Sequence, residues 1–157
     1  MRHPVVLCRL LLTPEHRLPA PVEGVARRQI ADTWGAPRSG GRRHRGVDIL
    51  ARRDTAVRST TPGIVASVGT VALGGNAVSV VGPRLSLHYY AHLDHFGAFK
   101  PGDKVQPGDV LGYVGDSGNA KGTPCHLHYG VYRMLVWPTD PWPLLEDGER
   151  ARVRGGA

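Results

Sequence analysis

Histidine is the residue type in this chain with the clearest capacity for chemistry. The chain contains eight histidines. An imidazole can bind a metal ion or carry a proton near neutral pH, so a group of them marks a candidate site. Six fall in or beside a region of short apolar runs, namely His44, His88, His92, His95, His126 and His128.

The clearest pair lies in the segment His126–Tyr132, which reads HLHYGVY. In a strand, His126 and His128 share one face about 6–7 Å apart, while Leu127, Tyr129 and Val131 form the other, apolar face. Such a pair suits a metal site in which one imidazole binds the ion and the other works on its water. Taken alone, the pattern favours two solvent-facing histidines.

A second pattern is His44-Arg45-Gly46-Val47-Asp48. In an extended strand its ends would lie about 13 Å apart, whereas zinc bonds to His and Asp are only about 2.0–2.2 Å long. Gly46 and the residues after it disfavour a helix, so a bend or bulge at Gly46 before a strand is the better way to bring His44 and Asp48 together. On its own the pattern favours a charged loop in which Asp48 pairs with a nearby arginine.

A third segment is Leu87–Leu93, LHYYAHL. Strand alternation puts His88 and His92 on one face with Tyr90 between them. One further catalytic imidazole could come from here, but we expect most of His88, His92 and His95 to be ordinary exposed residues. Periodicity does not choose among them.

The elements that must position these residues are strands. The chain has 157 residues, about one domain, and its 21 Gly and 13 Pro exclude coiled coils and helical bundles. Short apolar runs between turn residues indicate a compact all-β domain, with at most one or two helical turns over Val25–Ala31. The proline-rich segment after Val136 is predicted to be a surface strap. Five strands are predicted: Ile64–Val68, Ala77–Val81, Leu85–Leu93, Val110–Val114 and His126–Tyr132.

The charge and composition of the chain limit the classes of partner that it is expected to bind. The net charge is +7, and residues 1–58 hold 12 Arg against five acids. Such a surface attracts polyanions in general, but Trp34 is the only aromatic residue there, so we expect no nucleic-acid partner. No run of 18 apolar residues occurs, so we expect no integral membrane segment. Cys8 and Cys125 form no disulfide framework or metal-binding spacing, and Met1–Leu12 is a poor secretory signal.

The three histidine segments occur in the order H-x-G-x-D, Y-A-H-L and H-L-H-Y, and in this order they resemble the lysostaphin/LytM-type (beta-lytic) zinc metallopeptidases, which cut peptide bonds in bacterial peptidoglycan. The resemblance runs from about Trp34 to Tyr132. It includes the flanks Thr60–Val65, Gly74-Gly75-Asn76 and Val105–Gly112. The fold that it implies is a compact antiparallel β-sheet domain of the duplicated-hybrid-motif type.

The resemblance also implies the site. His44, Asp48 and His128 would bind one Zn²⁺ ion, and a water would complete the tetrahedron. His92 and His126 would be the catalytic residues flanking that water and the scissile carbonyl, and their division of labour stays open. His88 and His95 would be ordinary residues. Many relatives carry Glu where this chain has Gly130, which leaves groove shape or substrate choice open.

We therefore expect an irregular basic leader over 1–33, a zinc metallopeptidase domain over 34–145 and a flexible Arg/Gly-rich tail over 146–157. The expected function is a zinc endopeptidase that hydrolyses peptides of peptidoglycan as a monomer outside the cytoplasm. The alternative is a non-catalytic regulator of the same fold that binds the wall or activates a partner amidase. The presence of all five site residues favours the enzyme. A third alternative, a lipoyl- or biotinyl-type carrier domain, would need an exposed lysine at a tight turn, and neither Lys104 nor Lys121 has that context.

Overall fold

The computed structural model describes residues 17–147, and almost all of its regular structure is β-strand. Eleven strands occur in these residues: β1 (Leu18–Pro19), β2 (Val47–Leu50), β3 (Ala56–Arg58), β4 (Gly63–Val71), β5 (Gly75–Val81), β6 (Leu87–Phe96), β7 (Lys104–Val105), β8 (Val110–Val114), β9 (His126–Arg133), β10 (Trp137–Thr139) and β11 (Leu145–Glu146). The helical segments among them are short 3₁₀ turns: η1 (Arg27–Gln29), η2 (Ser39–Gly41), η3 (Pro83–Leu85), η4 (Gly118–Ala120) and η5 (Trp142–Leu144).

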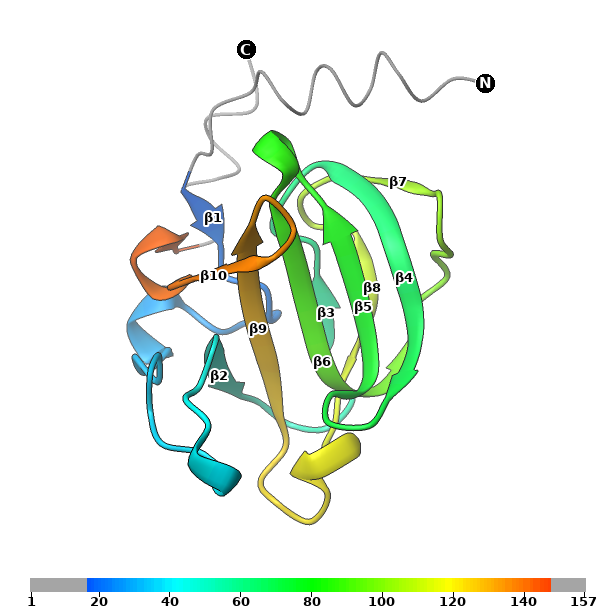
Figure 1. The fold of residues 1–157 in the computed structure, drawn as a ribbon. Coiled ribbons are helices and arrows are strands. Elements are labelled where there is room, and N and C mark those ends of the chain that lie inside the picture. Colours follow the sequence, from blue (N-terminus) through cyan, green and yellow to red (C-terminus); the bar gives the residue numbers. More distant parts are fainter. Residues whose placement is uncertain (1–16, 148–157) are drawn as a thin grey trace.

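The strands form one large antiparallel sheet and one small parallel pair (Figure 1). The main path of the large sheet is β10-β9-β6-β5-β4-β7. β2 pairs with the first half of β9 and β10 with its last residues. β8 pairs with β6 and carries β3, and both strands lie behind β5 and β6 in Figure 1. β9 is therefore held by three neighbours, which makes it a rigid support for side chains.

The core lies between the long strands and the β3–β8 pair. On β9, Leu127, Tyr129 and Val131 are fully buried, which confirms the predicted apolar face of this strand. Val57 of β3 and Leu111 of β8 join the same cluster of buried residues. The all-β fold is confirmed, and each of the five predicted strands falls on an observed one: β4, β5, β6, β8 and β9.

The proline-rich segment is only partly a strap. Residues 137–139 form β10, which pairs with β9. A proline is tolerated there because β10 lies at the edge of the sheet, where no further strand needs its missing N–H. The expectation of a surface strap is therefore wrong for these three residues.

Part of the expected leader belongs to the folded unit. Leu18, Val22 and Ile30 are buried in the core, and β1 pairs in parallel with β11. The possible helical turn at 25–31 is the single turn η1. The rest of the leader and most of the tail, residues 1–16 and 148–157, lie outside the described residues, and the division into leader, domain and tail stays a prediction.

Two further expectations concern cysteines and the membrane. Cys125 is a free, half-buried thiol, while Cys8 lies outside the described residues. Within 17–147, no helix has the length and apolar character needed to cross a bilayer.

Candidate metal centre

Strands β2 and β9 bring the first predicted motif onto the third. In their antiparallel register Asp48 lies opposite His128, and Leu50 lies opposite His126. The chain bends before β2, so that His44 Nε2 reaches 3.0 Å from Asp48 Oδ1 and 2.9 Å from His128 Nδ1. His128 Nδ1 lies 3.3 Å from Asp48 Oδ1. The predicted convergence of His44 and Asp48 through a bend is confirmed.

Gly46 permits this bend by its lack of a side chain. A Cβ at this position would lie 2.5 Å from the Tyr129 carbonyl oxygen and 2.8 Å from His128 Cε1. Both distances are well below ordinary van der Waals contact. The requirement at Gly46 is therefore close approach of the backbone to β9 and to the His128 ring.

The three converging atoms fit a metal ion by type and spacing. Two imidazole nitrogens and one carboxylate oxygen form a group that could hold a metal. Ligands bonded to zinc at about 2.0–2.2 Å in a tetrahedron lie about 3.3–3.6 Å from one another. The observed separations of 2.9, 3.0 and 3.3 Å are close to this spacing. Three protein ligands also leave the fourth position of a tetrahedron for water or substrate, as in catalytic zinc sites.

Thr33 organises two of these side chains from the segment before β2. His44 Nδ1 donates to the Thr33 carbonyl oxygen at 2.7 Å, which fixes the tautomer and leaves the Nε2 lone pair facing the cluster. The Asp48 backbone N–H donates to Thr33 Oγ1 at 3.0 Å. One threonine thus orients both ends of the H-x-G-x-D motif.

Asp48 contacts both the histidine cluster and a nearby arginine, the two alternatives that the sequence left open. Its Oδ1 faces the histidines, and its Oδ2 forms an ion pair with Arg38. Burial alone would raise the pKa of Asp48, but the close contacts with His128 and His44 outweigh it and hold that pKa far below its ordinary value. The carboxylate is therefore ionised at neutral pH. Burial lowers the pKa of His128, which favours the neutral imidazole that a metal ion requires.

His126 and His92 stand beside this cluster. His126 shares the face of His128 on β9, as predicted, and its Nε2 lies 4.0 Å from Asp48 Oδ1. The ring centroid of His92 lies 5.0 Å from that of His126 and 6.0 Å from that of His128. His126 Nδ1 donates to the Pro124 carbonyl at 2.9 Å, and His92 Nδ1 donates to the Ser117 carbonyl at 2.8 Å. Each bond leaves Nε2 free to accept a proton.

The backbone of His92 departs from regular strand geometry. Its φ is +64°, a left-handed conformation that non-glycine residues rarely adopt. The β5–β6 register shifts here, because Tyr90 pairs with Val78 and Leu93 pairs with Asn76. This bulge turns the His92 side chain toward the groove, and such bulges re-aim side chains beside active sites. Burial lowers the pKa of His92, so its imidazole is held neutral.

The bulge overturns the expectation that His88 and His92 share one face. His88 is fully buried in the core, where Nδ1 is hydrogen bonded with Tyr129 Oη at 2.8 Å and Nε2 with Ser86 Oγ at 2.9 Å. The expectation that His88 is an ordinary exposed residue is therefore wrong. Its burial lowers its pKa to about 3. His95 is exposed, lies near Asp94 and Asp54, and stacks on Tyr113 away from the cluster.

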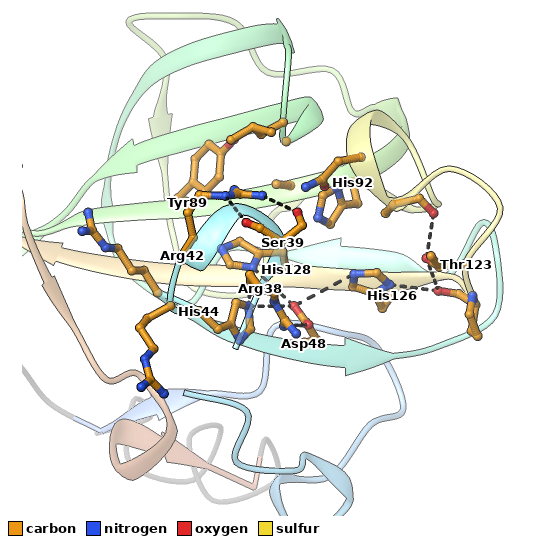
Figure 2. Close-up of a pocket in the computed structure, with 18 of the residues that line it drawn as sticks. Arg38, Ser39, Arg42, His44, Asp48, Tyr89, His92, Thr123, His126 and His128 are labelled. Atoms are coloured by element: carbon orange, nitrogen blue, oxygen red, sulfur yellow. Dashed lines mark hydrogen bonds and ion pairs between the residues drawn. The ribbon is translucent and has the colours of Figure 1, made fainter. Parts of the chain in front are cut away.

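All five predicted site residues line one groove of about 1010 Å³ (Figure 2). The groove also contains residues that the sequence did not single out. Tyr89 and Tyr132 lie on its walls, and Arg38 and Arg42 come from the segment around η2. Alternation along β6 places Tyr89 on the face opposite His88, so this tyrosine could have been found from the sequence once the core face was known.

Comparison with known proteins agrees with this geometry. The model of peptidase family M23 matches residues 42–141, a stretch that contains all five residues. The chain belongs to this family. It is 40% identical over 147 residues to the L-Ala–D-Glu endopeptidase of Bacillus subtilis. This alignment covers 87% of this chain and 44% of the relative. The chain thus spans less than half of the length of that curated relative.

Solved structures give the same result. The catalytic domain of lysostaphin from Staphylococcus simulans aligns with a TM-score of 0.66 and 26% identity, over 73% of this chain and 89% of that domain. A zinc-containing peptidase from Vibrio cholerae aligns with a TM-score of 0.69 and 27% identity, over 82% of this chain and 40% of its own. The predicted resemblance to lysostaphin/LytM-type peptidases is thereby confirmed.

Proposed function

We propose that this protein is a zinc-dependent endopeptidase that hydrolyses peptide bonds in bacterial peptidoglycan. The observation that carries the proposal is the convergence of His44 Nε2, Asp48 Oδ1 and His128 Nδ1 at 2.9–3.3 Å, with two further imidazoles beside them. His44, Asp48 and His128 would hold one zinc ion, whose charge would polarise the scissile carbonyl and lower the pKa of a bound water toward about 7.

The remaining histidines would carry the proton chemistry. His126 and His92 each keep Nδ1–H on a backbone carbonyl, so the free Nε2 atom of each can accept a proton from the attacking water or, once protonated, donate to the developing oxyanion. The low pKa of His92 makes its neutral form available at neutral pH. The Asp48 carboxylate is committed to the ligand set and to Arg38, so it is not the general base.

The family and its relatives support the proposed substrate and location. The relatives named above include a peptidase of L-Ala–D-Glu bonds and lysostaphin, and the sequence resembles enzymes that act on the bacterial wall. We therefore propose a peptide of peptidoglycan as the substrate and a location outside the cytoplasm. That the protein acts as a monomer stays a prediction.

The proposal is tested by digesting purified peptidoglycan with the recombinant protein. New amino termini, identified by mass spectrometry, should appear, vanish with a chelator and return when zinc is added. If zinc binds at one equivalent but no bond is cut, the enzyme proposal fails and the regulator function takes its place. In that case the protein should instead increase the activity of a wall amidase.

Variants separate the two roles within the site. His128→Ala should lose zinc and activity together, because it removes a ligand. His126→Ala should retain zinc but lose turnover. His95→Ala is the matched control, since His95 is an exposed histidine outside the groove, and it should behave as wild type. If His126→Ala lost zinc and His128→Ala retained it, the ligand assignment would be reversed.

A further inference from the structure

The groove beside the histidine cluster is strongly basic on one side. Four arginines from a single short segment line it, namely Arg38, Arg42, Arg43 and Arg45. All four are exposed to solvent. The one carboxylate among the lining residues is Asp48. A cleft lined by one sign of charge focuses the electric field and attracts ligands of the opposite sign.

Three of these arginines lack an acidic partner. Arg38 pairs with Asp48, but within residues 17–147 no carboxylate oxygen lies within 4.0 Å of Arg42, Arg43 or Arg45. Elsewhere in the fold, Arg53 is paired with Asp94 and Asp116. The three unpaired guanidinium groups therefore present uncompensated positive charge to the groove.

Neutral acceptors hold two of them in place. Arg42 donates from Nε to the Ser39 carbonyl at 3.0 Å and from Nη2 to Ser39 Oγ at 3.1 Å. Arg43 donates from Nη1 to the Gly35 carbonyl at 3.3 Å. These bonds use only some of the five N–H groups of each guanidinium and neutralise none of its charge. The side chains are thus partly ordered while still able to bind an anion.

Arg45 and Tyr132 both line the groove. Burial raises the pKa of the Tyr132 hydroxyl, and the positive charge of Arg45 opposes that rise. At Gly130 a Cβ would lie 3.1 Å from the Arg45 carbonyl and 3.2 Å from the Tyr132 ring. Because position 130 carries no side chain, no acid intervenes there between Arg45 and the groove.

Much of the remaining lining of the groove is uncharged. It includes Leu73, Gly74, Asn119, Ala120, Thr123 and Pro124. In Figure 2, Arg42 lies on one side of the His44–Asp48–His128 cluster, while His126 and Thr123 lie on the other. A peptide bound across the cluster would therefore meet a basic subsite on one side of the cleaved bond and an uncharged subsite on the other.

We propose that Arg42, Arg43 and Arg45 form a carboxylate subsite that selects peptides with a free carboxylate close to the cleaved bond. A guanidinium binds a carboxylate with two parallel hydrogen bonds, which gives geometric selectivity as well as attraction. This inference rests on the proposed endopeptidase function. It adds to that function the charge of the preferred substrate and the residues that read it.

The test compares one substrate in two charge states. Soluble peptidoglycan peptides, released from the glycan and purified, are used with free carboxylates or after conversion of those carboxylates to amides. The wild type should cleave the acidic form with a kcat/KM roughly ten- to a hundredfold higher than the amidated form. The double variant Arg42→Gln/Arg45→Gln should lose most of this preference by slowing cleavage of the acidic form alone.

Arg28→Gln is the matched control, because Arg28 is an exposed arginine that does not line the groove. It should keep the wild-type preference. Equal kcat/KM for the two forms in the wild type would overturn the inference. So would an equal slowing of both forms in the double variant, because the arginines would then not distinguish the two charge states. A loss of preference in Arg28→Gln as large as in the double variant would also overturn it, because it would indicate general attraction to the positive protein surface.

Calorimetric binding of the same peptides to the zinc-loaded protein separates this inference from the proposed function. If neither form is cleaved, the endopeptidase proposal fails, but the subsite is still supported when the acidic form binds at least about tenfold more tightly and the double variant loses that difference. Equal binding of the two forms would overturn the subsite whatever the activity.

Discussion

Replacing Gly46 by alanine should weaken metal binding without altering any ligand. The added Cβ would lie 2.5 Å from the Tyr129 carbonyl oxygen and 2.9 Å from His128 Nε2, where an ordinary contact begins at 3.4 Å. The contacts are thus about 0.5–0.9 Å too short, and both atoms belong to the well-packed strand β9. We expect β2 and β9 to separate locally, which moves Asp48 away from His128.

Two effects set the expected loss of stability and the expected loss of zinc affinity in Gly46→Ala. Overpacking of this kind typically costs about 1–3 kcal/mol, which corresponds to a fall in Tm of about 2–12 °C for a domain of this size. Disturbing the groups that orient metal ligands typically lowers metal affinity about 10–100-fold. We therefore expect Gly46→Ala to be folded at 25 °C, with a lower Tm and a zinc affinity reduced by one to two orders of magnitude.

The assay is a zinc titration against a chromophoric chelator, together with thermal unfolding followed by circular dichroism. Gly69→Ala is the matched control, because Gly69 lies within β4 and a Cβ there would have nothing within 4 Å. This control should bind zinc as the wild type does. A Gly46→Ala protein with unchanged zinc affinity would refute the argument that close approach at this glycine sets the ligand geometry.

Three further outcomes are expected. The pKa of His88 falls from 6.5 to about 3 on folding. Between these pH values His88 is protonated only in the unfolded state. The free energy of unfolding should therefore drop as pH falls below about 6.5, by up to about 1.4 kcal/mol per pH unit. In urea unfolding, His88→Gln should be less stable at pH 7.5 and should lose less on going to pH 5.5, and parallel pH profiles would contradict this. Thr33→Val keeps shape but removes the acceptor of the Asp48 N–H, and zinc titration should show affinity lowered about 10-fold. When free zinc is present at about a thousand times its Kd, adding a chelator should lower the free energy of unfolding by about 4 kcal/mol, measured as a lower Tm. An unchanged Tm would argue against a metal in the native fold.

Strand periodicity predicted the parts of this fold in which the chain is regular. On β9, the separation of His126 and His128 from the apolar face of Leu127 and Tyr129 could be predicted because side chains of a strand alternate strictly. The bend at Gly46 could be predicted because the bond lengths of a metal site exclude a straight strand there. Both arguments needed only local geometry.

The same rule failed where the backbone is irregular. A bulge at His92 reverses the alternation along β6, so His92 faces the groove while His88 lies in the core. No pattern in the sequence LHYYAHL marks this bulge, and only the family resemblance selected His92. The pairing of β1 with β11 was also out of reach, since each strand has two residues and they meet across the length of the chain.

A common device explains how the groove keeps its imidazoles ready for chemistry. His44, His92 and His126 each donate Nδ1–H to a backbone carbonyl, at 2.7, 2.8 and 2.9 Å respectively. The three carbonyls lie outside strands β2, β6 and β9, in connecting segments before β2 and β9. Because a backbone carbonyl can only accept, each bond fixes one tautomer and leaves Nε2 without a proton. The strands and the bend before β2 therefore set the distances between the histidines, while the connecting segments set their tautomers. A change in either should alter the site without replacing a single histidine.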